Sequence, residues 1–465
     1  MADNKCKLLV IGGGPGGYVC AIRAARLGVD TILVEADKAG GTCLNVGCIP
    51  SKALIHAAEE FHRACLYAAD NQLGIVATRP SINLQQTVQW KDGIVSRLNN
   101  GVSGLLKRAG VTVIAGQASF LDGKTVKVDT NDDSGSSVTI SAENIVIATG
   151  SEPQQLSAME FGGNVISSTE ALSLTEQPAT LAIVGGGYIG LEIGTAYAKL
   201  GSQVVIVESA DSILPQYDAK LTEPVAKRLA QLGVEVVTQA RASAFTGAGL
   251  EFQTGDGDIR QLPADKVLVT VGRRPRTHDC KLSELSLTMN GDFVKIDDRC
   301  QTSMRGVFAI GDVTGDPMLA HRAMAQGEMV AEIAAGLNRS WDKRCIPAVC
   351  FTDPEIVCAG LSPAEALAQD LEIDVAQFPF TASGRAMTME QEDGFVRVVA
   401  QKSDGVILGV QCVGASVSEL ASSFSLAIEM GARVDDVAAT IHAHPTLGEA
   451  FQEACMQACG HNLHN

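Results

Sequence analysis

The feature that most constrains the fold is a unit of strand, glycine-rich turn, helix and second strand, which occurs twice in the chain. The first copy begins with the apolar run Lys7–Ile11 and continues through Gly12, Gly14 and Gly17 into a helical pattern. A second apolar run ends at Glu35, 23 residues after Gly12. In such a unit the first glycine makes the tight turn, the second lets a pyrophosphate approach the backbone, and the third lets the helix pack on the strand.

The second copy follows the run Thr180–Val184. Its glycines are Gly185, Gly187 and Gly190, and its acid, Glu208, again lies 23 residues after the first glycine. One such turn is a weak signal, but two complete units with equally spaced acids indicate two dinucleotide sites in an α/β fold. Each acid is expected to accept hydrogen bonds from a ribose. Because Glu208 would repel a 2′-phosphate and no arginine pair follows it, the second site is predicted to prefer NAD to NADP.

A glycine-flanked cysteine pair, Cys43 and Cys48, follows the first unit. In a regular helix, Cα atoms five residues apart would be roughly 9 Å apart, beyond the ~7 Å that a disulfide tolerates. A bridge therefore requires a break in the helix, for which Gly47 supplies the backbone freedom. A disulfide that closes so short a loop stabilises little, so a redox role is predicted. The alternative is a pair of reduced, buried cysteines.

Composition excludes several classes of function. The 465 residues are 46% hydrophobic and 19% charged, which is typical of a soluble globular enzyme of roughly three domains. A net charge of −17 without any basic run argues against nucleic acid or an anionic membrane as partner. The sequence has neither a run of about 20 apolar residues nor a signal-peptide pattern, so a cytoplasmic protein is expected.

Most of the 13 cysteines are expected to be reduced and buried, and their spacing predicts no metal site. Cys455 and Cys459 share one helix face at a spacing of four residues. Packing is the favoured interpretation of this second pair, with a second redox pair as the alternative.

Five motifs together resemble the dihydrolipoamide dehydrogenases, which belong to the pyridine nucleotide–disulfide oxidoreductases. They are the cysteine segment Gly40–Lys52, Gly185–Glu192, Val271–Pro275, Phe308–Asp312 and His442–Ala450. The resemblance covers essentially the whole chain in the same order. The sequence as a whole is most similar to the form that serves a branched-chain 2-oxoacid dehydrogenase complex.

The resemblance implies four segments and a homodimer. Residues 1–150 would form the first part of an FAD-binding domain, 151–274 an inserted NAD-binding domain, 275–345 the rest of the FAD domain, and 346–465 an α+β interface domain for dimerisation. Each subunit would hold one non-covalent FAD, use NAD⁺ as co-substrate and act on the lipoyl domain of an acyltransferase component. The apolar runs Ile145–Gly150 and Val267–Gly272 bracket the second glycine unit, as expected for an insertion.

The resemblance also assigns the chemistry. Cys43 would exchange with the dithiol substrate, and Cys48 would be the thiol nearest the flavin. His444 would be the base and Glu449 the acid that orients it, serving the disulfide of the other subunit. His442 is the alternative base.

Further residues are assigned to the cofactors by resemblance. Lys52 and Glu192 would pair close to the flavin, and Tyr188 would cover the nicotinamide site, with simple packing as the alternative. The FAD contacts would be Gly12, Gly14, Gly17, Glu35, Thr42, Lys52, Gly116, Thr149, Gly150, Glu192, Asp312 and Ala320. The NAD contacts would be Gly185, Gly187, Tyr188, Ile189, Gly190, Glu208, Gly272 and Arg273.

The resemblance therefore implies oxidation of dihydrolipoyl groups through a Cys43–Cys48 disulfide and FAD, with reduction of NAD⁺. A glutathione reductase would instead need arginines after the second unit. A mercuric reductase would need a C-terminal vicinal cysteine pair, which residues 462–465 lack. A mainly structural flavoprotein subunit is the remaining alternative, and the cysteine, histidine and glutamate set argues against it.

Overall fold

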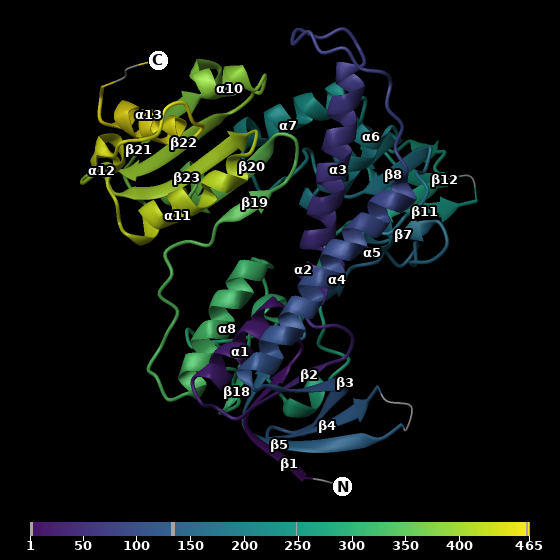
Figure 1. Ribbon diagram of the computed structural model, residues 1–465, viewed down its shortest axis with the longest axis vertical. Helices are drawn as coiled ribbons and strands as arrows, with labels where there is room; N and C mark the ends of the chain where they lie inside the picture. The colour runs from purple at the N-terminus through teal and green to yellow at the C-terminus, as the bar shows by residue number, and fades with distance from the viewer. Residues whose placement is uncertain (1–2, 132–134, 248, 462–463, 465) are drawn as a thin grey trace.

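The computed structural model describes residues 3–131, 135–247, 249–461 and 464, and its helices pack around three main sheets (Figure 1). The first sheet is at the bottom of Figure 1, the second at the upper right and the C-terminal sheet at the upper left. The α/β class predicted from the repeated units is confirmed.

The first sheet has a parallel core in which β1 pairs with β2 and β5, and β5 pairs with β18. Helix α1 (Pro15–Arg26) leaves the first glycine turn and packs against α8 (Ala320–Ala334). The strands are β1 (Asp3–Ile11), β2 (Thr31–Glu35), β3 (Thr112–Asp122), β4 (Thr125–Thr130), β5 (Ser137–Ile147) and β18 (Val307–Ala309). A strand from beyond residue 300 thus completes a sheet that begins at the N-terminus.

The second sheet is wholly parallel, in the order β10-β9-β8-β14-β7. Helix α6 (Tyr188–Leu200) packs against β8 and β9, and α7 (Ala219–Gln231) follows β9. The strands are β7 (Val165–Ile166), β8 (Thr180–Val184), β9 (Gln203–Val207), β10 (Glu235–Val237) and β14 (Lys266–Val269). A small antiparallel sheet accompanies it, with β11 (Arg241–Thr246), β12 (Gly249–Gln253) and β13 (Ile259–Leu262).

The C-terminal sheet is antiparallel, in the order β19-β20-β23-β22-β21. Phe424 and Phe451 meet edge to face beneath it, with ring centroids 5.0 Å apart. Its elements are β19 (Ala348–Cys350), β20 (Glu355–Gly360), β21 (Ile373–Pro379), β22 (Phe395–Gln401), β23 (Ile407–Gly414), α9 (Pro363–Ala368), α10 (Gly384–Thr388), α11 (Ala421–Glu429), α12 (Val434–Ala439) and α13 (Glu449–Ala458).

Two kinds of connection join the sheets. Strands β6 (Ser151–Pro153) and β15 (Arg273–Pro275) pair where the chain enters and leaves the second sheet. Helices α3 (Cys48–Tyr67) and α4 (Leu84–Ala109) form a long hairpin, and α3 packs against α6 (Figure 1). The remaining short elements are α2 (Gly41–Asn45), α5 (Ser168–Ala171), β16 (Met289–Asn290), β17 (Phe293–Val294) and the 3-10 helices at Leu282–Leu285, Gly311–Thr314, Phe380–Ala382 and Val417–Leu420.

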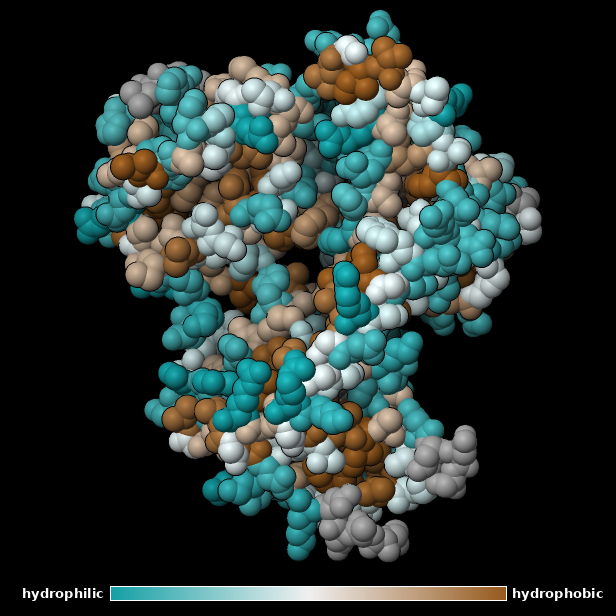
Figure 2. Space-filling model, viewed as in Figure 1, coloured by the Kyte–Doolittle hydropathy of each residue, from teal (hydrophilic) through white to brown (hydrophobic). Residues whose placement is uncertain are grey.

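The surface is mixed, with polar residues over most of the face in Figure 2 and apolar residues at the tip of the α3–α4 hairpin. Leu66, Leu73, Ile75 and Val76 are the exposed apolar residues of this tip. Among the residues described, no helix combines the length and the apolar composition that crossing a membrane requires.

Candidate active site

The cysteine pair lies where two helices meet. Helix α2 ends at Asn45, α3 begins at Cys48, and Gly47 between them has φ −135° and ψ −108°, which is not helical. The predicted break in the helix is therefore present. Both cysteines are free thiols in this structure, Cys43 half-buried and Cys48 exposed to the cavity that it lines.

The two thiols are electrostatically unequal. The hydrogen bond from the Cys43 side chain, aided by the Lys52 ammonium, lowers the pKa of Cys48 to about 7, although partial desolvation by the walls of the cavity acts to raise it. The same contact and burial raise the pKa of Cys43. Cys48 is thus the more readily ionised thiol of the pair, and Cys43 is the thiol that donates to it.

An ion pair between a half-buried lysine and a buried glutamate lies beside Cys48. Lys52 Nζ is 2.8 Å from Glu192 Oε2, and Glu192 is only 4% exposed. The second carboxylate oxygen accepts a hydrogen bond of 2.9 Å from the backbone N–H of Phe351, and the Phe351 ring lies 4.3 Å from Lys52 Nζ. Both oxygens of the buried carboxylate are therefore satisfied, which a buried charge requires.

The first glycine turn has the geometry of a phosphate cradle. Gly12 has φ +101°, and an added Cβ there would lie 2.3 Å from Ala148 O, while one at Gly17 would lie 1.8 Å from Gly12 O. At Gly14 the nearest atom to such a Cβ is 4.0 Å away, so this position is open. Glu35 Oε2 accepts a hydrogen bond of 2.5 Å from the Gly13 backbone N–H.

The second turn repeats these features. A Cβ at Gly185 would lie 2.6 Å from Thr270 O and one at Gly190 2.3 Å from Gly185 O, whereas Gly187 has nothing within 4 Å. Glu208 Oε2 accepts a hydrogen bond of 2.5 Å from the Gly186 N–H. Both turns therefore fit a dinucleotide: two glycines are needed for packing, and the middle one leaves room for a phosphate at a helix N-terminus.

One cavity collects many of the residues predicted for the flavin. Both cysteines, the first glycine turn and the start of α6 line it. The predicted residues among its lining are Gly12, Gly14, Gly17, Glu35, Thr42, Cys43, Cys48, Lys52, Gly116, Thr149, Gly150, Tyr188, Ile189, Glu192, Arg273, Asp312 and Ala320. The remaining predicted NAD contacts do not line this cavity. They lie in the second glycine turn or just after strands β9 and β14: Gly185, Gly187, Gly190, Glu208 and Gly272.

Ser151 links two of the predicted contacts. Its hydroxyl donates a hydrogen bond of 2.5 Å to Asp312 Oδ2 and accepts one of 2.8 Å from Arg273 Nε. Arg273 Nη2 also donates to Ser151 O at 2.8 Å. Arg273, predicted for NAD, thus lies in the same cavity as Asp312, predicted for FAD. Nearby, burial raises the pKa of Tyr188 to about 12, so its phenol is neutral.

The histidine motif forms a compact acid–base pair. His444 Nδ1 lies 2.9 Å from Glu449 Oε1, and Glu449 Oε2 accepts a hydrogen bond of 2.7 Å from the Thr446 N–H. Although burial acts to raise it, these hydrogen bonds lower the pKa of Glu449. The alternative base, His442, hydrogen-bonds a backbone carbonyl of Thr440 instead of an acid.

This pair is separate from the cysteine cavity of the same chain. The His444 side chain is 82% exposed and does not line that cavity. A single chain therefore presents His444 on its surface rather than at its own cysteines.

Comparison with known proteins identifies the family. The chain matches the pyridine nucleotide-disulphide oxidoreductases over residues 6–327 and the dimerisation domain of the same family over residues 346–455. The chain belongs to the pyridine nucleotide-disulphide oxidoreductase family. The resemblance found in the sequence is thus confirmed.

Full-length relatives give finer detail. The chain is 56% identical to a dihydrolipoyl dehydrogenase of Pseudomonas aeruginosa, and the match covers 99% of each of the two chains. It is 46% identical to dihydrolipoyl dehydrogenase 2 of Haloarcula marismortui, and that match covers 98% of each chain. Among solved structures, LpdA from Mycobacterium tuberculosis superposes with a TM-score of 0.89 at 28% identity, covering 97% of this chain and 99% of LpdA. The flavoprotein disulfide reductase RclA from Escherichia coli superposes with a TM-score of 0.84 at 25% identity and the same coverage.

In this oxidoreductase, the second cysteine pair, Cys455 and Cys459, matches the packing interpretation. Cys455 is buried, and Cys459 donates a hydrogen bond of 3.0 Å to Asp435. Burial raises the pKa of both thiols, which disfavours a second thiolate. Within the described ranges, no group of histidine, cysteine and acidic residues could hold a metal ion.

Sequence reasoning missed Ser151 and Phe351. Ser151 directly follows Gly150, which ends the apolar run Ile145–Gly150. This position was the only sequence feature that could have indicated a functional role for Ser151. Phe351 gave no signal, because an aromatic residue beside a strand ordinarily indicates core packing.

Proposed function

We propose that the protein is a dihydrolipoyl dehydrogenase, which oxidises protein-bound dihydrolipoyl groups to lipoyl groups and reduces NAD⁺ to NADH. The observation that carries this proposal is the unequal thiol pair, with the Cys48 thiolate beside Lys52 and Glu192 in the cavity of the first glycine turn. The full-length identity to curated dihydrolipoyl dehydrogenases supports the same conclusion.

The first turn is proposed to hold one non-covalent FAD per subunit, and the second to bind NAD⁺. When bound, the flavin supplies a two-electron relay between a dithiol and a nicotinamide. Its pyrophosphate would lie against the glycine turn of Gly12, Gly14 and Gly17, and Glu35 would accept hydrogen bonds from its ribose. Lys52 and Glu192 would tune the electronic properties of its ring. The remaining FAD contacts would be Thr42, Gly116, Thr149, Gly150, Asp312 and Ala320. Tyr188 would cover the nicotinamide site. The other NAD⁺ contacts would be Gly185, Gly187, Ile189, Gly190, Glu208, Gly272 and Arg273.

The cysteines are proposed to divide the exchange chemistry. One sulfur of the dihydrolipoyl group attacks Cys43 of the disulfide, forming a mixed disulfide and releasing Cys48 as a thiolate. The second substrate sulfur then attacks the first, which closes the lipoyl ring and frees Cys43. His444 accepts a substrate thiol proton and Glu449 stabilises the resulting imidazolium.

The base is proposed to act across a homodimer. His444 is exposed and lies outside the cysteine cavity of its own chain, and residues 346–455 match a dimerisation domain. His444 of the partner subunit would thus complete each site. The domain division into 1–150, 151–274, 275–345 and 346–465 is part of the same proposal, as are a cytoplasmic location and a lipoyl-bearing acyltransferase as partner.

Turnover by the purified holoenzyme tests the function. Dihydrolipoamide with NAD⁺ should yield NADH, whereas glutathione disulfide with NADPH should not be turned over. A protein that binds FAD but forms no NADH from dihydrolipoamide would exclude the proposal and favour a structural flavoprotein.

Single-cysteine variants test the division of labour between the thiols. Cys48→Ser should abolish the long-wavelength charge-transfer absorbance of the two-electron-reduced protein. Cys43→Ser should show that absorbance before any reduction, because it has no disulfide to open and its Cys48 thiolate would already lie beside the oxidised flavin. Retention of the band in Cys48→Ser would reverse the assignment.

A further inference from the structure

The segment between β9 and α7, residues 209–218, packs against the second glycine turn and is hydrogen-bonded to it. It is here called the 209–218 loop. Leu214 of this loop is fully buried, and its backbone N–H donates a hydrogen bond of 3.0 Å to Gly186 O. Leu214 has φ +48°, in the left-handed region that costs a non-glycine residue free energy. Such a conformation persists only where the surroundings hold it.

The start of the loop is tied to the turn itself. Glu208 accepts a hydrogen bond from Gly186 N–H with one oxygen and one of 2.7 Å from Ala210 N–H with the other. The carboxylate predicted to select NAD therefore joins the turn to the loop.

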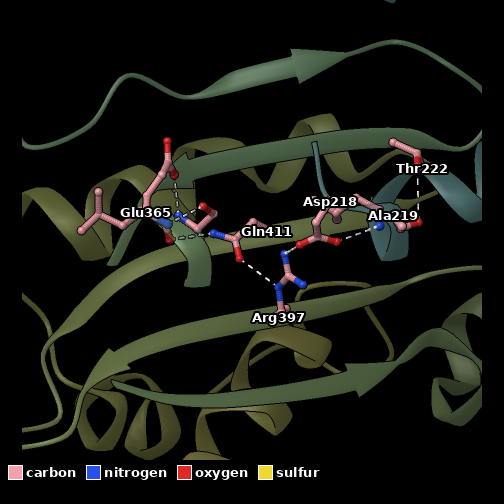
Figure 3. Close-up of polar contacts among 9 residues, drawn as sticks. Asp218, Ala219, Thr222, Glu365, Arg397 and Gln411 are labelled. Atoms are coloured by element: carbon pink, nitrogen blue, oxygen red, sulfur yellow. Dashed lines mark hydrogen bonds and ion pairs between the residues drawn. The ribbon is translucent and has the colours of Figure 1, made fainter. Parts of the chain in front are cut away.

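The end of the loop is tied to the C-terminal sheet. Asp218 is the N-cap of α7, and its Oδ1 accepts a hydrogen bond of 3.3 Å from Leu221 N–H. Its other carboxylate oxygen accepts a hydrogen bond from Nη2 of Arg397, on β22 (Figure 3). One carboxylate thus caps the helix and pairs with a cation from a different sheet.

Arg397 is fixed in place by its own sheet. It is only 5% exposed, and its Nε donates a hydrogen bond of 3.0 Å to Gln411 Oε1 on β23. The amide nitrogen of Gln411 in turn donates to Leu361 O at 2.9 Å (Figure 3). A buried guanidinium held this way presents one fixed position to Asp218, which an exposed and mobile side chain could not do.

A second contact joins the same loop to the same sheet. Cys350, at the end of β19, donates a hydrogen bond of 3.4 Å from its thiol to the Tyr217 hydroxyl. The 209–218 loop is thus fastened to the C-terminal sheet through two consecutive residues, Tyr217 and Asp218.

We propose that Arg397 is a positioning residue for NAD⁺ binding: through Asp218 it holds the 209–218 loop, and through Leu214 the loop holds Gly186 of the second turn. The inference rests on the proposed role of that turn in binding NAD⁺. It makes the C-terminal sheet, matched to a dimerisation domain, part of the support of the nucleotide site.

The test removes the ion pair from either side. Asp218→Asn keeps a good N-cap but loses the charge, and Arg397→Met keeps an apolar stem but loses the guanidinium. Lys227→Met is the matched control, because Lys227 of α7 pairs with Asp393 at 2.8 Å across the same boundary, with both side chains more than half exposed.

Equilibrium binding of NAD⁺ to the oxidised holoenzyme is measured by calorimetry. Asp218→Asn and Arg397→Met should each raise the dissociation constant about tenfold, and the double variant should bind no more weakly than the weaker single variant. Lys227→Met should bind as the wild type does. Hydrogen exchange at the Leu214 amide should accelerate in both ion-pair variants but not in the control.

Unchanged NAD⁺ affinity in a folded Asp218→Asn protein would overturn the proposal, as would equal weakening in Lys227→Met. A slower reduction of the Cys43–Cys48 pair by dihydrolipoamide, equal in size to the loss of NAD⁺ affinity, would also overturn it by indicating general disruption. Failure of the proposed function would appear in the wild type as absent dihydrolipoamide turnover. Failure of this inference would appear in the comparison of the variants, while the wild type still turns over dihydrolipoamide.

Discussion

The two glycine-rich turns have the same internal geometry. In each, a backbone N–H of the turn donates a hydrogen bond of 2.5 Å to a glutamate at the end of the next strand: Glu35 is the last residue of β2, and Glu208 directly follows β9. In each, a Cβ on the first or third glycine would collide with backbone oxygen. Residues close in sequence produce this geometry, so both copies repeat it.

The surroundings of the two turns differ. The first turn opens on the cavity of Cys43 and Cys48, and Glu35 is half-buried. The second turn lies on its own parallel sheet, with Glu208 only 8% exposed and a strained loop packed against it. The same local unit therefore lies in two different settings, one open on the cysteine cavity and one covered by a packed loop.

The largest effects are expected from equivalent glycine-to-alanine substitutions in the two turns, one of which should abolish flavin binding and the other NAD⁺ binding. Gly17→Ala places a Cβ 1.8 Å from Gly12 O, so the purified protein should contain no flavin by absorbance. Gly190→Ala places one 2.3 Å from Gly185 O, so the protein should keep its flavin and lose NAD⁺ binding.

Gly93 supplies the control for both substitutions. It lies in α4 with no atom within 4 Å of an added Cβ, so Gly93→Ala should leave both ligands bound and raise the free energy of unfolding by about 0.4–1 kcal/mol. Loss of flavin in Gly190→Ala would show that the two turns are not independent.

The histidine pair belongs to neither turn, so its loss should spare both ligands. His444→Gln should lower kcat/KM for dihydrolipoamide by about 10²–10⁴-fold, as expected for removal of a general base. Flavin content and the dissociation constant of NAD⁺ should be unchanged. A matching substitution, His442→Gln, should have little effect, and the opposite ranking would make His442 the base.

The contrast between the turns also explains what the sequence could predict. The glycine units and the helix break at Gly47 arise from neighbouring residues, so local patterns in the sequence were enough to predict them. Phe351 contacts Glu192 from 159 positions away, and Arg397 contacts Asp218 from 179 positions away. Their roles depend on how separate sheets pack, which no local pattern records, so an arginine in a strand indicated nothing about the nucleotide turn.

The two glutamates should differ in which ligand they affect. Glu208→Gln removes the charge that opposes a 2′-phosphate, while its amide oxygen can still accept from Gly186 N–H. The dissociation constant for NAD⁺ should rise about tenfold, and that for NADP⁺ should fall. Glu35→Gln should weaken FAD binding and leave the preference for NAD⁺ intact. Equal use of NADP⁺ by the wild type would contradict the role given to Glu208.

The smallest expected effect is that of the ion pair between Lys52 and Glu192, which joins the cysteine helix of the first turn to the helix of the second turn. Lys52 stands on α3 beside the cysteines, whereas Glu192 stands on the first turns of α6, the helix that begins at the second glycine turn. The Lys52 ammonium stabilises the Cys48 thiolate, whose pKa is about 7, whereas the Glu192 carboxylate acts to raise that pKa. Below that pH Cys48 takes up a proton, so the charge-transfer absorbance of the reduced protein should fade as the pH falls through about 7.

Removing the cation should move this transition to higher pH, because a thiolate without the ammonium is less stable. Lys52→Met should therefore slow alkylation of Cys48 by iodoacetamide several-fold at pH 7, by roughly the ratio of thiolate fractions. Lys52→Arg, which keeps the charge, should restore most of the rate. If Lys52→Met left the alkylation profile unmoved, the hydrogen bond from Cys43 alone would account for the thiolate, and the charge of Lys52 would have no influence on the cysteines.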